Sequence, residues 1–256
     1  MLLAINVNNT NTTVGLYTGD KWVANWRIKT DQAKQPDEYA MLLRNLFLYN
    51  ESNWSDVTGV ALASVVPPLT ANFVDLCQRY FHLEPLLVTH KIKTGVKILI
   101  DHPAEAGADR VLNALAAREL HGCPCIVVDF GTATTFDTVS REGDYIGGAI
   151  APGLGISADA LFSRTARLPR IELKAPPGAI GRNTIHAMQS GLIFGYLGLV
   201  EGMVNRFRTE LGGGAKVIAT GGMAHFLAQE SGIFETVDQM LTLNGLRLIY
   251  DLNRMG

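Results

Sequence analysis

The sequence of 256 residues has little of several features that define large classes of protein. It has only three cysteines, Cys77, Cys123 and Cys125, and this spacing matches neither a zinc site nor a redox Cys-x-x-Cys motif. It has no basic stripe, and its net charge is −2, which argues against nucleic acid as a partner because backbone phosphates require clustered Lys and Arg. We therefore expect reduced thiols in a cytoplasmic protein that binds no nucleic acid.

Long hydrophobic runs are also missing. The N-terminal "MLLAINV" has no basic segment and is too short for a signal peptide. The most apolar window, residues 191–204, contains Glu201 and is shorter than the ~20 residues that span a bilayer, so the sequence predicts no membrane partner. Glycines recur every three or four residues in this window, which predicts a close helix–helix contact in the core or between subunits.

What is present is an internal repeat. The first part of the chain predicts strands over residues 2–7, 12–19 and 21–28, then a helix that begins at Pro36. A buried strand over 57–66, a helix over about 70–80 and a strand over 85–88 follow. Residues 125–150 restart the strand–turn–strand pattern, which predicts an α/β protein of two duplicated domains, residues 1–121 and 122–256, that face each other across a cleft.

The two copies superpose with an offset of 123 residues. This offset places Asn6 on Asp129, Asn8 on Gly131, Asn9 on Thr132 and Thr12 on Thr135. In the second copy, a carboxylate at the strand end can hold a cation, a glycine lets backbone amides approach phosphate, and threonine hydroxyls add donors. The first copy is then a phosphate loop that has Asn6 in place of the carboxylate and Asn8 in place of the glycine. A polar hairpin with no ligand is the alternative.

Several motifs in the sequence resemble those of a known superfamily and, within it, those of one family. The threonine-rich hairpins and a late "ATGG" resemble the actin-like ATPase and sugar-kinase superfamily, whose domains are ribonuclease H-like. The segments "DHPAEAGADRVLNA" (101–114), "DFGTATTFD" (129–137), "GGAIAPGLGISADALFSRTARLPRIEL" (147–173) and "GRNTIHAMQSGL" (181–192) resemble the type III pantothenate kinases, also called the Bvg accessory factor family. The likeness covers nearly the whole chain.

This resemblance implies phosphorylation of pantothenate by ATP with Mg²⁺, the first step of coenzyme A synthesis, in a homodimer. It implies that Asp109 is the proton acceptor and that Asp129 holds a monovalent cation, K⁺ or NH₄⁺. The same motif and a later threonine would bind pantothenate: Gly107, Ala108, Asp109, Arg110 and Thr184. Residues of both hairpins would bind ATP: Asn6, Val7, Asn8, Asn9, Thr10, Asn11, Thr12, Thr13 and Thr132.

Each of these residues also has a structural interpretation. Asp109 could stabilise the first turn of its helix through the helix dipole, and Asp129 could bond amides of its own turn. Arg110 could form a surface ion pair, and Thr184 could cap its helix.

Asn6 and Asn8 depart from the family pattern, which has Asp and Gly at these two places. Three interpretations remain: a working kinase of low or altered metal dependence, a catalytically weak member kept as a nucleotide-binding or regulatory protein, or a chain altered from an ordinary kinase. Kinase identity is favoured over a non-catalytic binder because all of the motif residues are present, although a protein that only binds nucleotide would not need them: Asp109, Arg110, Asp129, Thr132 and Thr184.

Overall fold

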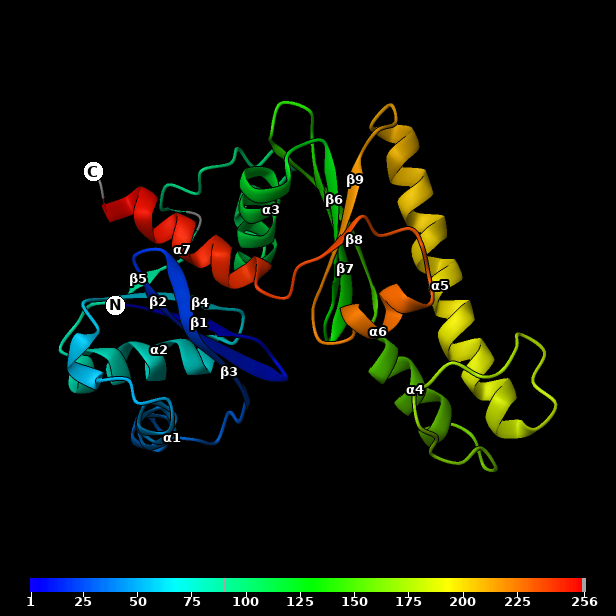
Figure 1. Ribbon diagram of the computed structural model, residues 1–256, viewed down its shortest axis with the longest axis horizontal. Helices are drawn as coiled ribbons and strands as arrows, with labels where there is room; N and C mark the ends of the chain where they lie inside the picture. The colour runs from blue at the N-terminus through cyan, green and yellow to red at the C-terminus, as the bar shows by residue number, and fades with distance from the viewer. Residues whose placement is uncertain (90, 255–256) are drawn as a thin grey trace. The chain divides into compact units, whose positions relative to one another are not determined.

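The structure is a computed structural model that describes residues 1–89 and 91–254. The chain forms two compact units (Figure 1). The first unit comprises Met1–Lys97, Asp101–Ala116 and Met240–Gly256, and the second comprises Ile98–Ile100 and Ala117–Gln239. The domain boundary after residue 121 stays a prediction.

Each unit contains one five-stranded mixed sheet. The first sheet has the order β3-β2-β1-β4-β5, in which β2 is antiparallel to both neighbours and β4 and β5 run parallel to β1. Its strands are β1 (Leu2–Val7), β2 (Asn11–Thr18), β3 (Lys21–Lys29), β4 (Gly59–Ser64) and β5 (Leu86–Leu87).

The second sheet repeats this arrangement strand for strand, in the order β8-β7-β6-β9-β10. Its strands are β6 (Cys125–Phe130), β7 (Ala133–Val139), β8 (Tyr145–Pro152), β9 (Lys216–Thr220) and β10 (Thr236–Val237). The predicted α/β fold with two duplicated ribonuclease H-like domains is confirmed.

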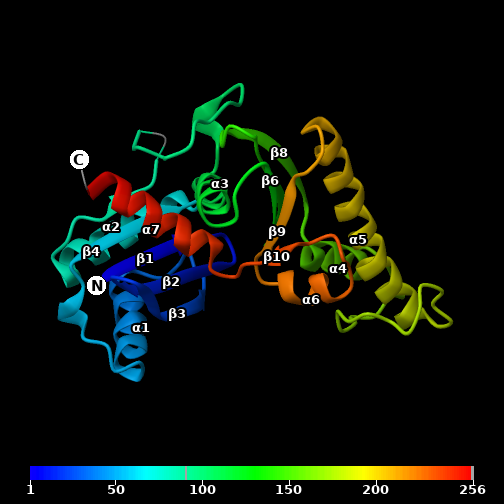
Figure 2. The ribbon, with the colours of Figure 1, turned by 45° about the horizontal axis from the view of Figure 1, so that its top comes forward.

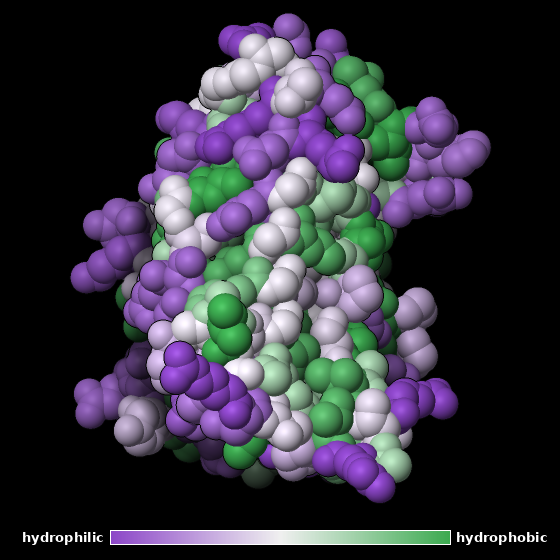
Figure 3. All heavy atoms as spheres, turned by 90° about the vertical axis from the view of Figure 1, so that its right-hand side faces the viewer, coloured by the Kyte–Doolittle hydropathy of each residue, from purple (hydrophilic) through white to green (hydrophobic). Residues whose placement is uncertain are grey.

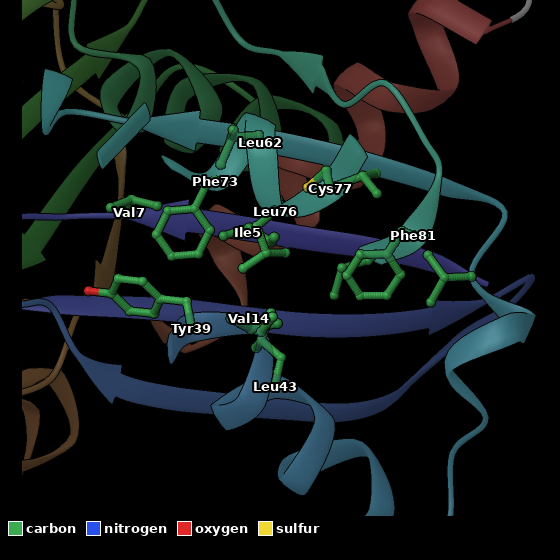
Figure 4. Close-up of a cluster of buried hydrophobic side chains, with 14 of the residues drawn as sticks. Ile5, Val7, Val14, Tyr39, Leu43, Leu62, Phe73, Leu76, Cys77 and Phe81 are labelled. Carbon is green, nitrogen blue, oxygen red and sulfur yellow. The ribbon is translucent and has the colours of Figure 1, made fainter. Parts of the chain in front are cut away.

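Helices cover both faces of the first sheet (Figures 1 and 2). On one face, α1 (Pro36–Tyr49) and α2 (Pro67–Leu76) enclose the main apolar core of this unit, where Ile5 and Val14 meet Tyr39 and Phe73 (Figure 4). The C-terminal helix α7 (Leu241–Arg254) packs on the sheet through β1, β2 and β4. Its Leu243 approaches Gly15, whose neighbours in β2 point into the opposite core.

In the second unit, α4 (Leu154–Ser163), α5 (Thr184–Glu210) and α6 (Ala224–Gln229) share one core with the sheet. Alternate residues of β6 point into this core, where Ile126 and Val128 are buried with Ile193 and Val200 of α5. Among the described residues, α5 is the one helix that is long and apolar enough to cross a bilayer by length and composition. Its buried residues form part of the core of this unit.

The remaining elements connect these layers. Helix α3 (Ala108–His121) follows the first sheet in the chain, as α7 follows the second. Short turns of 3-10 helix lie at Trp54–Asp56 and Pro103–Glu105, and a π-helical turn lies at Cys77–Phe81. The helix predicted over 70–80 begins earlier, at Pro67, because a proline in the first turn lacks only an N–H that the helix would leave unpaired. The strand predicted over 57–66 is shorter, Gly59–Ser64.

The strand pairing corrects one detail of the predicted repeat. Val7 pairs with Thr12, whereas Phe130 pairs with Thr134, so the second hairpin loop is one residue shorter than the first. Beyond the loop the offset is therefore 122, and Thr12 corresponds to Thr134 and not to Thr135. Both of these threonines are fully buried, which supports the corrected pairing.

Candidate active site

The first hairpin ends in two buried amide oxygens. The Oδ1 atoms of Asn6 and Asn8 are buried and, within the part of the chain that the structure describes, have no hydrogen-bond partner. Leaving a buried acceptor unpaired costs about 1–3 kcal/mol, so a ligand that brings a donor to this place gains that free energy. Water bound to a magnesium ion is such a donor. The residues therefore fit a hydrated Mg²⁺, although they bring no charge to it.

Asn8 forms its turn without the backbone conformation that favours glycine. Its amide donates to the carbonyl oxygen of Asn11 at 3.1 Å. The non-glycine residues with positive φ in the described ranges are Glu51 and His82, so Asn8 is not among them. Asparagine adopts positive φ more readily than most residues, but the loop does not require it here. The consequence of Asn8 is the side chain that it presents to a ligand.

The other predicted ATP-binding residues of this loop differ in exposure. Asn9 and Thr10 are exposed, and Asn11 and Thr13 are partly exposed, so their side chains are accessible. The side chains of Val7 and Thr12 are fully buried, and the Thr12 hydroxyl is hydrogen-bonded to that of Thr30 at 2.9 Å. These two residues could reach a ligand only through their backbone.

The second hairpin is enclosed by two glycines. A Cβ on Gly221, which follows β9 at φ +90°, would lie 2.4 Å from Oδ1 of Asp129 and 2.7 Å from the amide nitrogen of Phe130. A Cβ on Gly153 would lie 2.2 Å from the carbonyl oxygen of Thr132 and 2.7 Å from that of Gly131. Neither residue is among the predicted site residues. The signal was present in "ATGG" and "APGLG", where a strand ends in glycine.

Gly153 also brings the start of a helix to this loop. It is the N-cap of α4, and its close approach to Gly131 and Thr132 places the first turn of α4 beside them. A helix N-terminus presents unpaired amides that favour anions. Gly131 and Thr132 are exposed, and the Gly131 amide donates to the carbonyl oxygen of Ala133 at 3.1 Å, so the first turn of α4 is the part of this site that presents amides to a phosphate group.

Asp109 lies in the first turn of α3, as predicted. Its Oδ1 accepts a hydrogen bond from the Arg110 amide at 2.9 Å, and a Cβ on Gly107 would lie only 2.7 Å from the same oxygen. Burial raises the pKa of Asp109 above its usual value, and the amide and charge of Arg110 oppose that rise. A carboxylate of raised pKa is a stronger base, which suits a proton acceptor.

Thr184 lies at an open groove in the second unit. The groove has a volume of about 750 Å³, within the range of small-molecule sites. Besides Thr184, its lining includes Ser157, Leu161, Arg182 and Met188. Asn183 is the N-cap of α5, because its Oδ1 accepts from the His186 amide at 2.9 Å. The interpretation of Thr184 as the cap is therefore wrong.

Comparison with known proteins identifies the family. A sequence profile described as type III pantothenate kinase matches residues 2–206. The chain belongs to this family. The type III pantothenate kinase of Roseiflexus sp. (strain RS-1) is 52% identical over 254 residues, which is 99% of this chain and 100% of that protein. That of Myxococcus xanthus is 49% identical over 253 residues, with 99% of both chains covered.

Solved structures support the fold of this family. A protein described as a Baf family transcriptional activator from Campylobacter jejuni superposes with a TM-score of 0.62 at 18% identity, covering 99% of this chain and 100% of that one. Component A of (R)-2-hydroxyglutaryl-CoA dehydratase from Acidaminococcus fermentans gives 0.57 at 14% identity, with 97% and 96% covered. At these identities the likeness concerns the actin-like ATPase fold alone.

The family motifs are divided between the two units. The loop 6–13 and Gly107–Arg110 lie in the first unit, and Asp129, Thr132 and Thr184 lie in the second. In the described residues, no three His, Cys, Asp or Glu side chains gather as a metal site. A cation at Asp129 would therefore have fewer than three of these side chains as ligands in the described ranges, and hydroxyl, backbone or phosphate oxygens would supply the others.

Proposed function

We propose that the protein transfers the γ-phosphate of ATP to the primary hydroxyl of pantothenate. The similarity to type III pantothenate kinases over the full length supports this activity. The observation that carries the proposal is the geometry of Gly107–Arg110, where a carboxylate of raised pKa lies at the start of α3 over a glycine. The cytoplasm, where ATP is available, is the expected location.

Asp109 accepts the proton of the hydroxyl as the new bond to phosphorus forms. An alcohol is a poor nucleophile at neutral pH, and a positioned base contributes roughly 10²–10⁴-fold to the rate. The Arg110 amide donates to Oδ1 of Asp109 and so holds the carboxylate at the start of α3. The Arg110 guanidinium binds the pantothenate carboxylate, because its planar fork can donate two parallel hydrogen bonds.

The two hairpins bind the phosphates of ATP. The first turn of α4, beside Thr132, binds phosphate oxygens, and the loop 6–13 binds ATP together with Mg²⁺. Asp129 holds a monovalent cation. When bound, the two cations neutralise charge on the transferring group, which accounts for much of the catalysis in phosphoryl transfer.

The proposed assembly is a homodimer through α5. Gly191, Gly195, Gly198 and Gly202 lie on the exposed face of this helix, with open space where a Cβ would be. Figure 3 shows the side of the molecule that carries α5, where apolar and near-neutral surface lies between polar groups. A second helix can approach such a face closely.

A coupled assay for ADP formation tests the activity. We expect ADP to form only when ATP and pantothenate are both present, and at a lower rate when choline replaces K⁺. Titration calorimetry distinguishes the alternative function. A kinase binds nucleotide and pantothenate, whereas binding of nucleotide without pantothenate, and without ADP formation, would favour a regulatory nucleotide-binding protein.

A further inference from the structure

The two duplicated hairpins differ at one pair of positions. Both have a register shift at the same place, between Leu16 and Tyr17 in β2 and between Thr138 and Val139 in β7. With the offset of 122, Gly15 corresponds to Asp137. Tyr17 pairs with Trp22 and Val139 pairs with Tyr145, so Trp22 corresponds to Tyr145. The first copy therefore has a glycine, Gly15, beneath a tryptophan. At the equivalent place the second copy has a carboxylate, Asp137, beside a tyrosine.

In the first copy this place is apolar. A Cβ on Gly15 would lie 2.6 Å from the ring of Trp22, so the indole lies directly over the glycine. The Trp22 Nε1 donates outward to Oδ1 of Asn244 on α7, at 2.8 Å. This arrangement packs the hairpin against α7 and provides no charge to the loop.

In the second copy a buried carboxylate fixes a hydroxyl group. Asp137 is fully buried, its Oδ1 accepts from the Tyr145 hydroxyl at 3.1 Å, and its Oδ2 accepts from Thr135 Oγ1 at 3.0 Å. An ionised carboxylate can only accept, so the hydroxyl of Thr135 donates its single proton to Asp137. Both lone pairs of Thr135 Oγ1 then remain available to other groups.

Thr135 lies opposite the residue whose carboxylate is assigned to the cation. Thr135 pairs with Asp129 across β6 and β7, so their side chains stand on the same face of the sheet, with Cβ atoms about 5 Å apart. Both side chains are only partly buried. An ionised carboxylate and a hydroxyl whose hydrogen is bonded to another acceptor form a pair of oxygen ligands with one negative charge. Oxygen ligands suit a hard cation, and a single negative charge balances a monovalent one.

We propose that Thr135 Oγ1 is a ligand of the monovalent cation, and that Asp137 and Tyr145 are positioning residues that hold it as an acceptor. The proposal rests on the proposed cation at Asp129 and extends it to residues with no assigned role. It also explains the asymmetry of the repeat, because the first hairpin has Thr13 at the equivalent place but no carboxylate to orient it.

Thermal unfolding tests the proposal by a readout other than activity. KCl replaces choline chloride at constant ionic strength, with a non-hydrolysable ATP analogue, Mg²⁺ and pantothenate present. We expect K⁺ to raise the unfolding temperature of the unchanged protein. For Thr135→Val, the K⁺ concentration that gives half of this rise should increase about 10–100-fold. For Thr135→Ser, which keeps the hydroxyl, this concentration should stay close to that of the unchanged protein. Tyr145→Phe should cause an increase in the same direction.

Thr138→Val is the matched control, because it makes the same change in the same strand on the opposite face. It should leave the K⁺ midpoint unchanged. The proposal is overturned if K⁺ does not stabilise the unchanged protein, or if Thr135→Val responds to K⁺ as the unchanged protein does. Failure of the proposed kinase activity is a separate outcome, because a protein that binds K⁺ through Thr135 without forming ADP would contradict only that activity.

Discussion

Asn6 and Asp129 occupy the same position in the two duplicated sheets, one residue before the end of the central strands β1 and β6. Asn6 is neutral and its Oδ1 is buried without a partner among the described residues, whereas Asp129 brings a carboxylate. The charge that a cation requires is therefore concentrated in the second hairpin. This asymmetry separates the chain from the family pattern and leads to the first prediction.

Replacing Asn6→Asp and Asn8→Gly together should increase ATP turnover with pantothenate. The carboxylate adds a charge beside Mg²⁺, and the glycine removes a side chain from the phosphate loop. By analogy with one preorganised electrostatic group, the increase should be on the order of 10²-fold in kcat. Steady-state kinetics at saturating Mg²⁺ measures it. A double variant that folds and binds ATP but is no faster than the original would contradict the effect assigned to Asn6 and Asn8.

Asp109→Asn should lower kcat by roughly 10²–10⁴-fold, because the amide cannot accept the proton. The affinity for ATP should change little, since Asp109 is assigned to the hydroxyl and not to the nucleotide. Single-turnover kinetics and calorimetry measure the two quantities. A variant that keeps its rate would show that another group accepts the proton.

The same variant should change the dependence of stability on pH. Because burial raises the pKa of Asp109, the folded state holds this proton more tightly than the unfolded state does. The carboxyl therefore reduces the unfolding free energy as pH rises from near its ordinary pKa of about 4 through the raised value. Asp109→Asn removes this loss and should be the more stable protein at neutral pH. Urea unfolding of both proteins across this range measures the difference, and equal pH profiles would contradict the raised pKa.

Gly107→Ala should reduce the rate with little loss of stability. Its Cβ would lie 2.7 Å from Oδ1 of Asp109, and that oxygen is the end of a short side chain that can move aside. The carboxylate would then leave its place beside the Arg110 amide. Gly178→Ala is the control, because its Cβ would meet nothing within 4 Å. Equal kcat values for the two variants would show that the position of the carboxylate does not limit the rate.

Gly153→Ala should weaken ATP binding and destabilise the second unit. Its Cβ would meet the carbonyl oxygens of Thr132 and Gly131, which are backbone atoms and can move only with the loop. Gly155→Ala changes the same helix in open space and is the control. Calorimetry with the ATP analogue and thermal unfolding measure the two effects. Unchanged values in both would mean that the loop accommodates the added methyl group.

The repeat could be predicted from the sequence, but its register could not be followed through the turn. The offset of 123 aligns β1 with β6, because each is a short run of buried, mostly apolar residues that leads into a polar loop. It misaligned Thr12 because a superposition without gaps cannot detect a turn that is one residue shorter. The pairing of Val7 with Thr12 and of Phe130 with Thr134 supplies that information.

The motifs predicted the site residues, but the residues that hold them in place could be found only from contacts in the three-dimensional structure. Asp109, Asp129 and Thr184 stood out through their spacing in family motifs, and their roles stay predictions. Gly153 and Gly221 were missed because their importance lies in backbone atoms that are distant in sequence. Helix α7 was also missed, although Leu246 and Ile249 belong to an amphipathic pattern. Its Gly245 lies against the backbone of Leu112 in α3, a contact that no local pattern predicts.

Transfer of labelled phosphate from γ-³²P ATP to pantothenate tests the central claim most directly. The unchanged protein, Asp109→Asn and the double variant of Asn6 and Asn8 would be compared at saturating K⁺ and Mg²⁺. The account predicts labelled phosphopantothenate from the unchanged protein, much less from Asp109→Asn and more from the double variant. Equal labelling by the unchanged protein and Asp109→Asn, or no labelling even by the double variant, would contradict it.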